Sequence, residues 1–209
     1  MLDNKKEFNN IKVHTQYSIC EGAIKIDDLA NYCKTNKIKA IGLADSYNLC
    51  GALEFAEKIS KTGTQPIIGT QINILSENQI GKITLYATSE QGYKNLTKLS
   101  SKSYLNNKAS HDPYCEISDL ILNNEDLILL TGNYKDFFGK LFYANKTKYF
   151  EQIIKRLKSS FKDRLYIEIQ RHGEHQESNY ENYLLNISSS YDLPIIAGQE
   201  VYYLDESMA

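Results

Sequence analysis

The sequence predicts an α/β fold in which seven strands alternate with helices and close into a β/α barrel. Its 209 residues, 42% of them hydrophobic, suffice for one domain that buries about 70% of its unfolded surface. Short apolar runs alternate with segments of helical periodicity, which is typical of parallel βαβ units. Polar residues follow nearly every predicted strand: His14, Asp45, Gln71, Asn133, His172 and Glu200. A barrel would bring all of these to one rim, whereas an open doubly wound sheet would gather only those near a switch point.

The first half of the chain contains four of these strands. Residues 11–18 form a short alternating run, and a helical pattern begins at Ile26. Residues 38–44 read as a buried strand, and the next helix spans residues 53–59. The third and fourth strands, residues 66–75 and 83–87, are joined through a polar turn.

The second half continues the alternation. Ser89 fits the N-cap of a long helix that reaches Tyr104. Residues 106–113 are the most loop-like segment, and a short helix is expected at residues 117–122. Strands follow at residues 126–132, 165–169 and 193–197, and helices at residues 137–143, 150–157 and 183–189. No internal repeat or linker divides the chain, so we expect one domain over residues 1–209.

Charge and composition exclude several classes of protein. A net charge of −2 gives no general attraction to nucleic acid or to anionic membranes. No apolar run approaches the ~20 residues of a membrane span, and the N-terminus has no signal-peptide core. The four cysteines form no close CxxC pair, which favours reduced thiols. A cytoplasmic protein without a membrane partner is the simplest interpretation.

Histidines and carboxylates at the predicted rim are the candidates for chemistry. A hydrolytic metal site needs several such ligands and an open position for water, and His14, Glu21, Asp45, His172 and Glu200 could contribute. The alternative is that both histidines are hydrogen-bonded rim residues and that the acids are caps or solvated. Spacing alone favours this alternative, because polar residues at strand ends are common in α/β folds. No phosphate-binding glycine loop or GxSxG elbow is present.

A series of motifs resembles one family across almost the whole chain. The motifs are Val13-His-Thr-Gln-Tyr-Ser, Ala44-Asp-Ser-Tyr-Asn-Leu, Gln65-Pro-Ile-Ile-Gly, Gln91-Gly-Tyr-Lys-Asn-Leu, Leu129-Leu-Thr-Gly, Glu168-Ile-Gln-Arg-His-Gly and Pro194-Ile-Ile-Ala. Together they resemble the N-terminal PHP (polymerase and histidinol phosphatase) domain of bacterial replicative DNA polymerase III alpha subunits. The resemblance implies a distorted seven-stranded (β/α)7 barrel of the PHP type, which agrees with the strand count. It also implies an N-terminal fragment of a much longer polymerase.

The resemblance further implies a degenerate metal site. Metal-binding members of the family use nine ligand positions, which fall here on Lys12, His14, Glu21, Ser46, Gln71, Lys82, Asn133, Glu200 and Tyr202. Of these residues only His14, Glu21 and Glu200 can ligate a metal. A protonated lysine has no lone pair and repels a divalent cation, so we expect the two lysines to form ion pairs with Glu21 or Glu200 instead. We therefore expect no metal, no cofactor and no catalytic residue in this domain.

The expected role follows from that loss. The domain would be a structural module of a DNA-directed DNA polymerase and a docking surface for the proofreading exonuclease subunit of the replicase. Nucleotidyl transfer, its Mg ions and contact with DNA would belong to the absent polymerase palm and the full-length enzyme. The alternative is a metal-dependent phosphoesterase that uses His14, Glu21, Asp45, His172 and Glu200.

Overall fold

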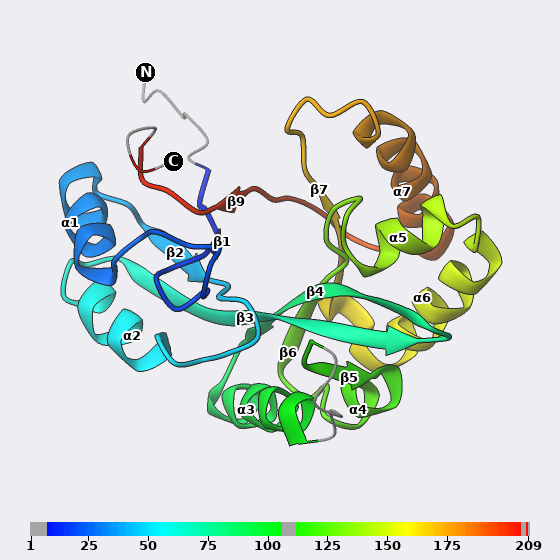
Figure 1. Ribbon diagram of the computed structural model, residues 1–209, viewed down its shortest axis with the longest axis horizontal. Helices are drawn as coiled ribbons and strands as arrows, with labels where there is room; N and C mark the ends of the chain where they lie inside the picture. Colours follow the sequence, from blue (N-terminus) through cyan, green and yellow to red (C-terminus); the bar gives the residue numbers. More distant parts are fainter. Residues whose placement is uncertain (1–7, 106–111, 206–207, 209) are drawn as a thin grey trace.

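The computed structural model describes residues 8–105, 112–205 and 208, and it confirms the α/β class (Figure 1). Within these residues, nine strands form one mixed sheet in the order β8-β7-β6-β4-β3-β2-β1-β9, and β5 pairs with β3. The strands are β1 (Lys12–Val13), β2 (Ala40–Leu43), β3 (Gln65–Ser76), β4 (Gln79–Ala87), β5 (Tyr114–Glu116), β6 (Leu127–Leu130), β7 (Leu165–Ile169), β8 (Ile195–Ala197) and β9 (Glu200–Val201).

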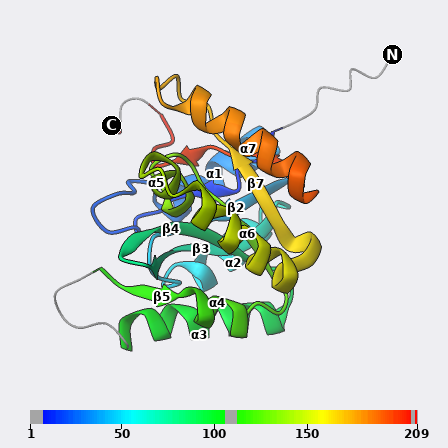
Figure 2. The same ribbon diagram turned by 90° about the vertical axis from the view of Figure 1, so that its right-hand side faces the viewer.

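Helices pack around this sheet over two apolar clusters. The helices are α1 (Ile26–Asn36), α2 (Ala52–Ser60), α3 (Glu90–Leu105), α4 (Ile117–Leu122), α5 (Phe137–Tyr143), α6 (Thr147–Phe161) and α7 (Glu177–Tyr191). The smaller cluster lies under α1 and α2, and the larger one lies between the sheet and α3 to α7. Figure 2 shows α6 and α7 beside β7, with α3 and α4 at the opposite side of the sheet.

The prediction of parallel crossovers throughout is wrong at β3 and β4. These strands form an antiparallel hairpin with Ser76 opposite Gln79, and β4 is also antiparallel to β6. The two turn residues, Glu77 and Asn78, both have positive φ, at 43° and 62°. A two-residue turn of this kind reverses the chain and leaves no room for a crossover helix.

The two ends of the sheet are formed by strands that follow each other in sequence. Strand β8 pairs with β7, and β9 pairs with β1. Only Gly198 and Gln199 separate the two strands, so one extended segment joins the two edges. This connection brings residues from β1, β7 and β9 together.

Other boundaries also differ from the prediction. Strand β1 stops at Val13 because a turn follows, in which the N–H of Ser18 donates to the carbonyl of Thr15. Strands β5 and β9, of three and two residues, were not predicted. Helices α6 and α7 each have 15 residues, more than their apolar patterns indicated. The Ser89 cap is confirmed by a bond from the N–H of Gly92 to its hydroxyl. Of the predicted loop, residues 106–111 lie outside the described residues.

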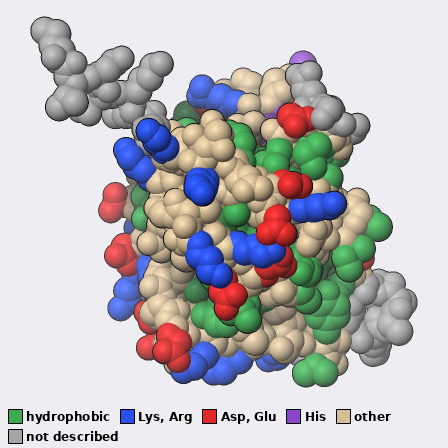
Figure 3. All heavy atoms as spheres, turned by 90° about the vertical axis from the view of Figure 1, so that its left-hand side faces the viewer, with side chains coloured by type: hydrophobic (Ala, Val, Ile, Leu, Met, Phe, Trp, Pro, Cys, Tyr) green, Lys and Arg blue, Asp and Glu red, His purple; other side chains and the backbone are tan. Residues whose placement is uncertain are grey.

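The surface is of mixed charge. On the face over α1 and α2, lysines alternate with acidic side chains and small apolar areas (Figure 3). No helix in the described part of the chain is long and apolar enough to cross a membrane.

Candidate functional site

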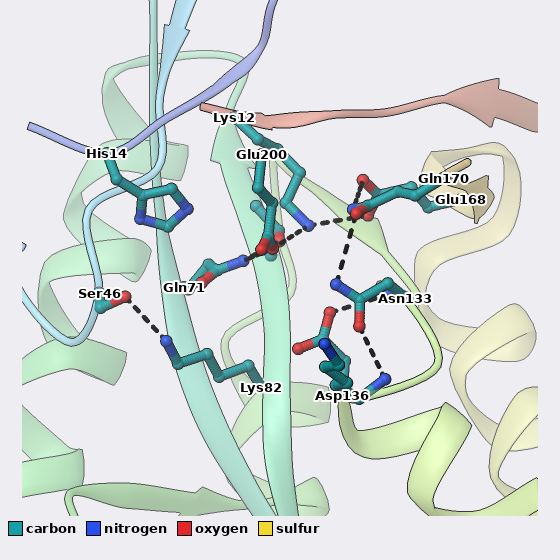
Figure 4. A network of polar contacts seen from close by, with 12 residues as sticks. Lys12, His14, Ser46, Gln71, Lys82, Asn133, Asp136, Glu168, Gln170 and Glu200 are labelled. Atoms are coloured by element: carbon teal, nitrogen blue, oxygen red, sulfur yellow. Dashed lines mark hydrogen bonds and ion pairs between the residues drawn. The ribbon is translucent and has the colours of Figure 1, made fainter. Parts of the chain in front are cut away.

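Four of the rim residues that the sequence singled out lie close together in the network of polar contacts in Figure 4, namely His14, Gln71, Asn133 and Glu200. The network begins at the ends of β1 and β2, crosses β3, β4 and β9, and reaches the residues that follow β6 and β7. Gln71 lies within β3 and Lys82 lies within β4, since the hairpin extends both strands past the rim. The sequence predicted a polar turn before a fourth strand at residues 83–87, but Lys82 is part of that strand.

A buried lysine lies at the centre of this network. The Lys12 ammonium lies 3.2 Å from Oε2 of Glu168 and 2.9 Å from Oε1 of Glu200. The Lys12 and Glu168 side chains have no exposed surface, and that of Glu200 is 14% exposed. Burial alone would lower the pKa of Lys12, but the two carboxylates raise it above its ordinary value. Lys12 is therefore a permanent cation that joins β1, β7 and β9.

Both glutamates are held by further hydrogen bonds. The Gln71 amide donates to Oε1 of Glu200 at 2.7 Å, and the Tyr202 hydroxyl donates to Oε2 at 2.8 Å. Burial would raise the pKa of Glu200, but Lys12 lowers it to about 2. The Gln170 amide donates to Oε1 of Glu168 at 2.7 Å. All four of these carboxylate oxygens thus have a protein partner.

Gly198 makes room for the Glu168 carboxylate. A Cβ at position 198 would lie 2.0 Å from Oε1 of Glu168. Because Lys12 and Gln170 hold that carboxylate, it could not move aside without breaking both contacts. The glycine at the junction of β8 and β9 thus belongs to the site.

The network continues from Gln170 to Asn133 and His172. The Oε1 atom of Gln170 accepts from Nδ2 of Asn133 at 3.3 Å and lies 3.0 Å from Nε2 of His172. The amide nitrogen of Gln170 donates to Glu168. The atom that faces His172 is therefore the amide oxygen, an acceptor, and the histidine Nε2 is the donor. His172 is therefore a hydrogen-bonded rim residue.

The second lysine forms a separate ion pair. Lys82 lies 2.8 Å from Oε1 of Glu21 and 3.1 Å from the hydroxyl of Ser46, which in turn donates to Oε2 of Glu21 at 2.5 Å. Burial would raise the pKa of Glu21, but the bonds from Lys82 and Ser46 lower it. Lys12 and Lys82 thus both contact glutamates, as expected from the sequence.

Hydrogen bonds determine the protonation of His14. Nδ1 of His14 lies 3.3 Å from the Ser18 hydroxyl, whose one hydrogen is donated to Oδ1 of Asp45 at 2.7 Å. Nδ1 must therefore carry the proton, and Nε2 keeps its lone pair. Nε2 is buried, with no hydrogen-bond partner among the described residues. The ring stacks on Tyr202 with centroids 4.4 Å apart. Burial, with Lys12 and Lys82 nearby, lowers the pKa of His14 to about 4.

Asp45 has a structural role. Besides Ser18, it accepts from the backbone N–H and the hydroxyl of Thr15 at 2.6 and 2.8 Å. Burial raises its pKa, and these bonds oppose the shift. Asp45 therefore fixes the turn after β1 and, through Ser18, the His14 ring.

Sequence reasoning missed Glu168, Gln170 and Asp136 as members of the site. Glu168 carries one signal, a charge inside the otherwise apolar strand β7. Asp136 precedes α5, where an acid reads as a helix cap, and its Oδ2 accepts from the N–H of Asn133 at 2.9 Å. Burial raises the pKa of Asp136 to about 7, although Lys12 opposes the shift.

The side chains present do not fit a multinuclear metal centre. Within residues 8–105, 112–205 and 208, no group of three or more His, Cys, Asp or Glu side chains could hold a metal ion. The Glu21 and Glu200 oxygens nearest the lysines are bonded to ammonium groups. Among the described residues, His14 Nε2 and Gln71 Oε1 are buried without a hydrogen-bond partner, and a neutral amide oxygen is a weak metal ligand. The arrangement is a set of compensated ion pairs.

Comparison with known proteins identifies the family. The family described as the PHP domain matches residues 10–172, more than half of the chain. The chain belongs to the PHP domain family. This PHP domain is 32% identical over 203 residues to the DNA polymerase III subunit alpha of Vibrio cholerae, covering 96% of the chain and 18% of the relative. It is 34% identical over 204 residues to the same subunit of Caulobacter vibrioides, covering 94% and 18%. The chain thus spans less than a fifth of the length of these relatives.

Solved structures share the PHP-type fold at low sequence identity. A putative metal-dependent phosphoesterase from Bifidobacterium adolescentis superposes with a TM-score of 0.59 at 12% identity, covering 93% of this chain and 87% of the other. An amidohydrolase from Chromobacterium violaceum, with bound sulfate and no metal, gives 0.58 at 10% identity and covers 96% and 89%. At these identities the likeness concerns the fold alone.

Proposed function

We propose that this chain is the PHP domain of a bacterial replicative DNA polymerase III alpha subunit, and that this domain is metal-free and non-catalytic. The similarity to alpha subunits of Vibrio and Caulobacter supports the first part. The observation that carries the second part is the Lys12 ammonium between Glu168 and Glu200. A lysine whose pKa is raised stays protonated at neutral pH and repels the divalent cation that a phosphoesterase would need.

The role of the domain is then structural. Lys12 joins the three strands at which the sheet edges meet, so the ion pairs take over the cross-linking that a metal cluster provides elsewhere. The polymerase reaction and its Mg ions belong to the longer cytoplasmic chain. The domain supports that chain and offers a docking surface to the proofreading exonuclease subunit.

Metal analysis tests the metal-free state. Protein incubated with Zn²⁺ or Mn²⁺ and then desalted should retain well below one equivalent of metal. His14→Asn should not change this content, and His175→Asn, at an exposed histidine, serves as the matched control. One equivalent or more that is lost only on His14→Asn would overturn the proposal.

Phosphoesterase assays test the rival activity. With Mn²⁺ and a phosphodiester substrate, we expect no turnover above background. Metal-dependent turnover that His14→Ala abolishes would establish the phosphoesterase function instead.

A binding experiment tests the docking role. The full-length alpha subunit should form a complex with its cognate exonuclease subunit, and replacing residues 1–209 by a metal-binding PHP domain should weaken it. Equal affinity for both polymerases would remove this domain from the interface.

A further inference from the structure

Strand β8 has one edge that pairs with no other strand of the described residues. In its parallel ladder with β7, the carbonyl of Pro194 accepts from the N–H of Ile167, and the N–H of Gly198 donates to the carbonyl of Ile169. Alternate residues of a parallel strand face the same neighbour, so Ile196 faces β7. The N–H and C=O groups of Ile195 and Ala197 face the other edge. Within the described residues, these groups make no hydrogen bond.

An apolar groove lies beside this edge. Its volume is about 430 Å³, and its walls are Phe8, Ile169, Arg171, Ile195, Ala197, Gly198 and Gln199. Phe8 is 51% exposed and Ile195 is 46% exposed. The guanidinium of Arg171 already pairs with Glu181 through two hydrogen bonds, at 2.9 and 2.6 Å. The groove is therefore suited to an apolar occupant rather than to an acidic one.

The uncovered state of β8 follows from the order of the elements. A helix comes soon after each of β2, β4, β5, β6 and β7 in the sequence, but two residues after β8 the chain enters β9. A strand with an open edge and an exposed isoleucine is normally covered or blocked, since it otherwise invites pairing with other chains.

We propose that this groove is the docking site for an extended segment of the same polypeptide, contributed by the part of the longer polymerase that lies outside residues 1–209. The inference rests on the proposed function only in that the chain belongs to such a polymerase. The relatives support this occupant, because the chain spans 18% of their length. Strand β9 follows β8 directly and pairs with β1, and Phe8, at the start of the described chain, lines the same groove as Gly198 and Gln199.

The geometry defines the contact. A residue of the added segment, placed between Ile195 and Ala197, accepts from the N–H of Ala197 and donates to the carbonyl of Ile195. Its neighbouring side chains, which alternate along an extended strand, fill the space between Phe8 and Ile195. This is addition of a strand to a sheet edge, with main-chain bonds for affinity and an apolar groove for selectivity.

Hydrogen exchange in the full-length protein tests the strand pairing. We expect the amide of Ala197 to exchange at least tenfold more slowly in the full-length wild-type protein than in full-length Ile195→Asp, which places a charge in the groove. Leu122→Asp is the matched control, because Leu122 is 78% exposed on α4, and it should leave the exchange rate of Ala197 unchanged. Rapid exchange in the wild type, or equal effects of both variants, would overturn the proposal.

A second variant removes only the free donor. Ala197→Pro deletes the outward N–H and leaves the β7 ladder of Ile196 intact, and the extended backbone at Ile196 tolerates a following proline. In the full-length protein, Ala197→Pro should increase several-fold the rate at which a protease cleaves the chain between residue 209 and the rest of the polymerase. Unchanged cleavage would contradict the proposal, and so would protection of Ala197 that rises with protein concentration, which would indicate a second copy as the occupant. Metal binding at the rim, which would refute the proposed function, leaves these measurements unaffected.

Discussion

Replacing Lys12 by methionine tests whether the buried ion pairs hold the sheet edges together. Methionine keeps the unbranched chain and removes the ammonium, so Glu168 and Glu200 are left buried without their counter-ion. Breaking a buried pair by removing one partner costs about 3–5 kcal/mol. A second route gives a similar figure, since protonating one glutamate from a pKa of about 4.3 at pH 7 costs about 3.7 kcal/mol. At an m value of about 2 kcal/mol/M, the urea midpoint should fall by about 1.5–2.5 M.

Lys58 provides a matched control on the surface. It also contacts two carboxylates, Asp27 at 2.6 Å and Glu54 at 2.7 Å, but its side chain is 34% exposed. Water and salt screen such pairs, so Lys58→Met should leave the midpoint nearly unchanged although the charge change is the same. Adding Glu168→Gln and Glu200→Gln to Lys12→Met should recover part of the loss. Equal midpoints for Lys12→Met and Lys58→Met would refute the reasoning.

Three further outcomes are expected. The His14 pKa falls from 6.5 to about 4 on folding, so its contribution to stability is complete above pH 6.5 and is lost as the pH falls to about 4. Urea titrations should therefore show that the free energy of unfolding of His14→Gln decreases less than that of the wild type over this range. Folding raises the pKa of Asp136 from 3.8 to about 7, so its contribution to stability is complete below pH 3.8 and is lost as the pH rises to about 7. The difference in the free energy of unfolding between Asp136→Asn and the wild type, measured by the same urea titrations, should therefore favour the variant more at pH 8 than at pH 4. Gly198→Ala should destabilise the protein by about 1–3 kcal/mol through its clash with Glu168, with a smaller cost in a Glu168→Ala background; equal cost in both would place the strain elsewhere.

Much of the fold could be predicted from the sequence because its signals are local. Apolar periods of two and 3.6 residues located most of the longer helices and strands, and Ser89 marked the start of α3 through a hydroxyl three residues from its partner. The motif series also indicated the family, since it depends on residue types in order and not on contacts. The hairpin was misread because apolar content shows that a segment is a strand but not in which direction it pairs.

The candidate site, like the fold, could be predicted from the sequence only in part. The resemblance to the PHP family led to the prediction that lysines stand at two of the family's metal-ligand positions and that few ligands remain. Only the tertiary structure brought Glu168 to Lys12, 156 positions away along the chain, and showed why residue 198 must be glycine. The proton on Nδ1 of His14 likewise follows from a hydroxyl and a carboxylate on other segments. These properties depend on distances between distant parts of the chain, which local periodicity does not encode, so the ion pairs between β1, β7 and β9 became visible only in the folded molecule.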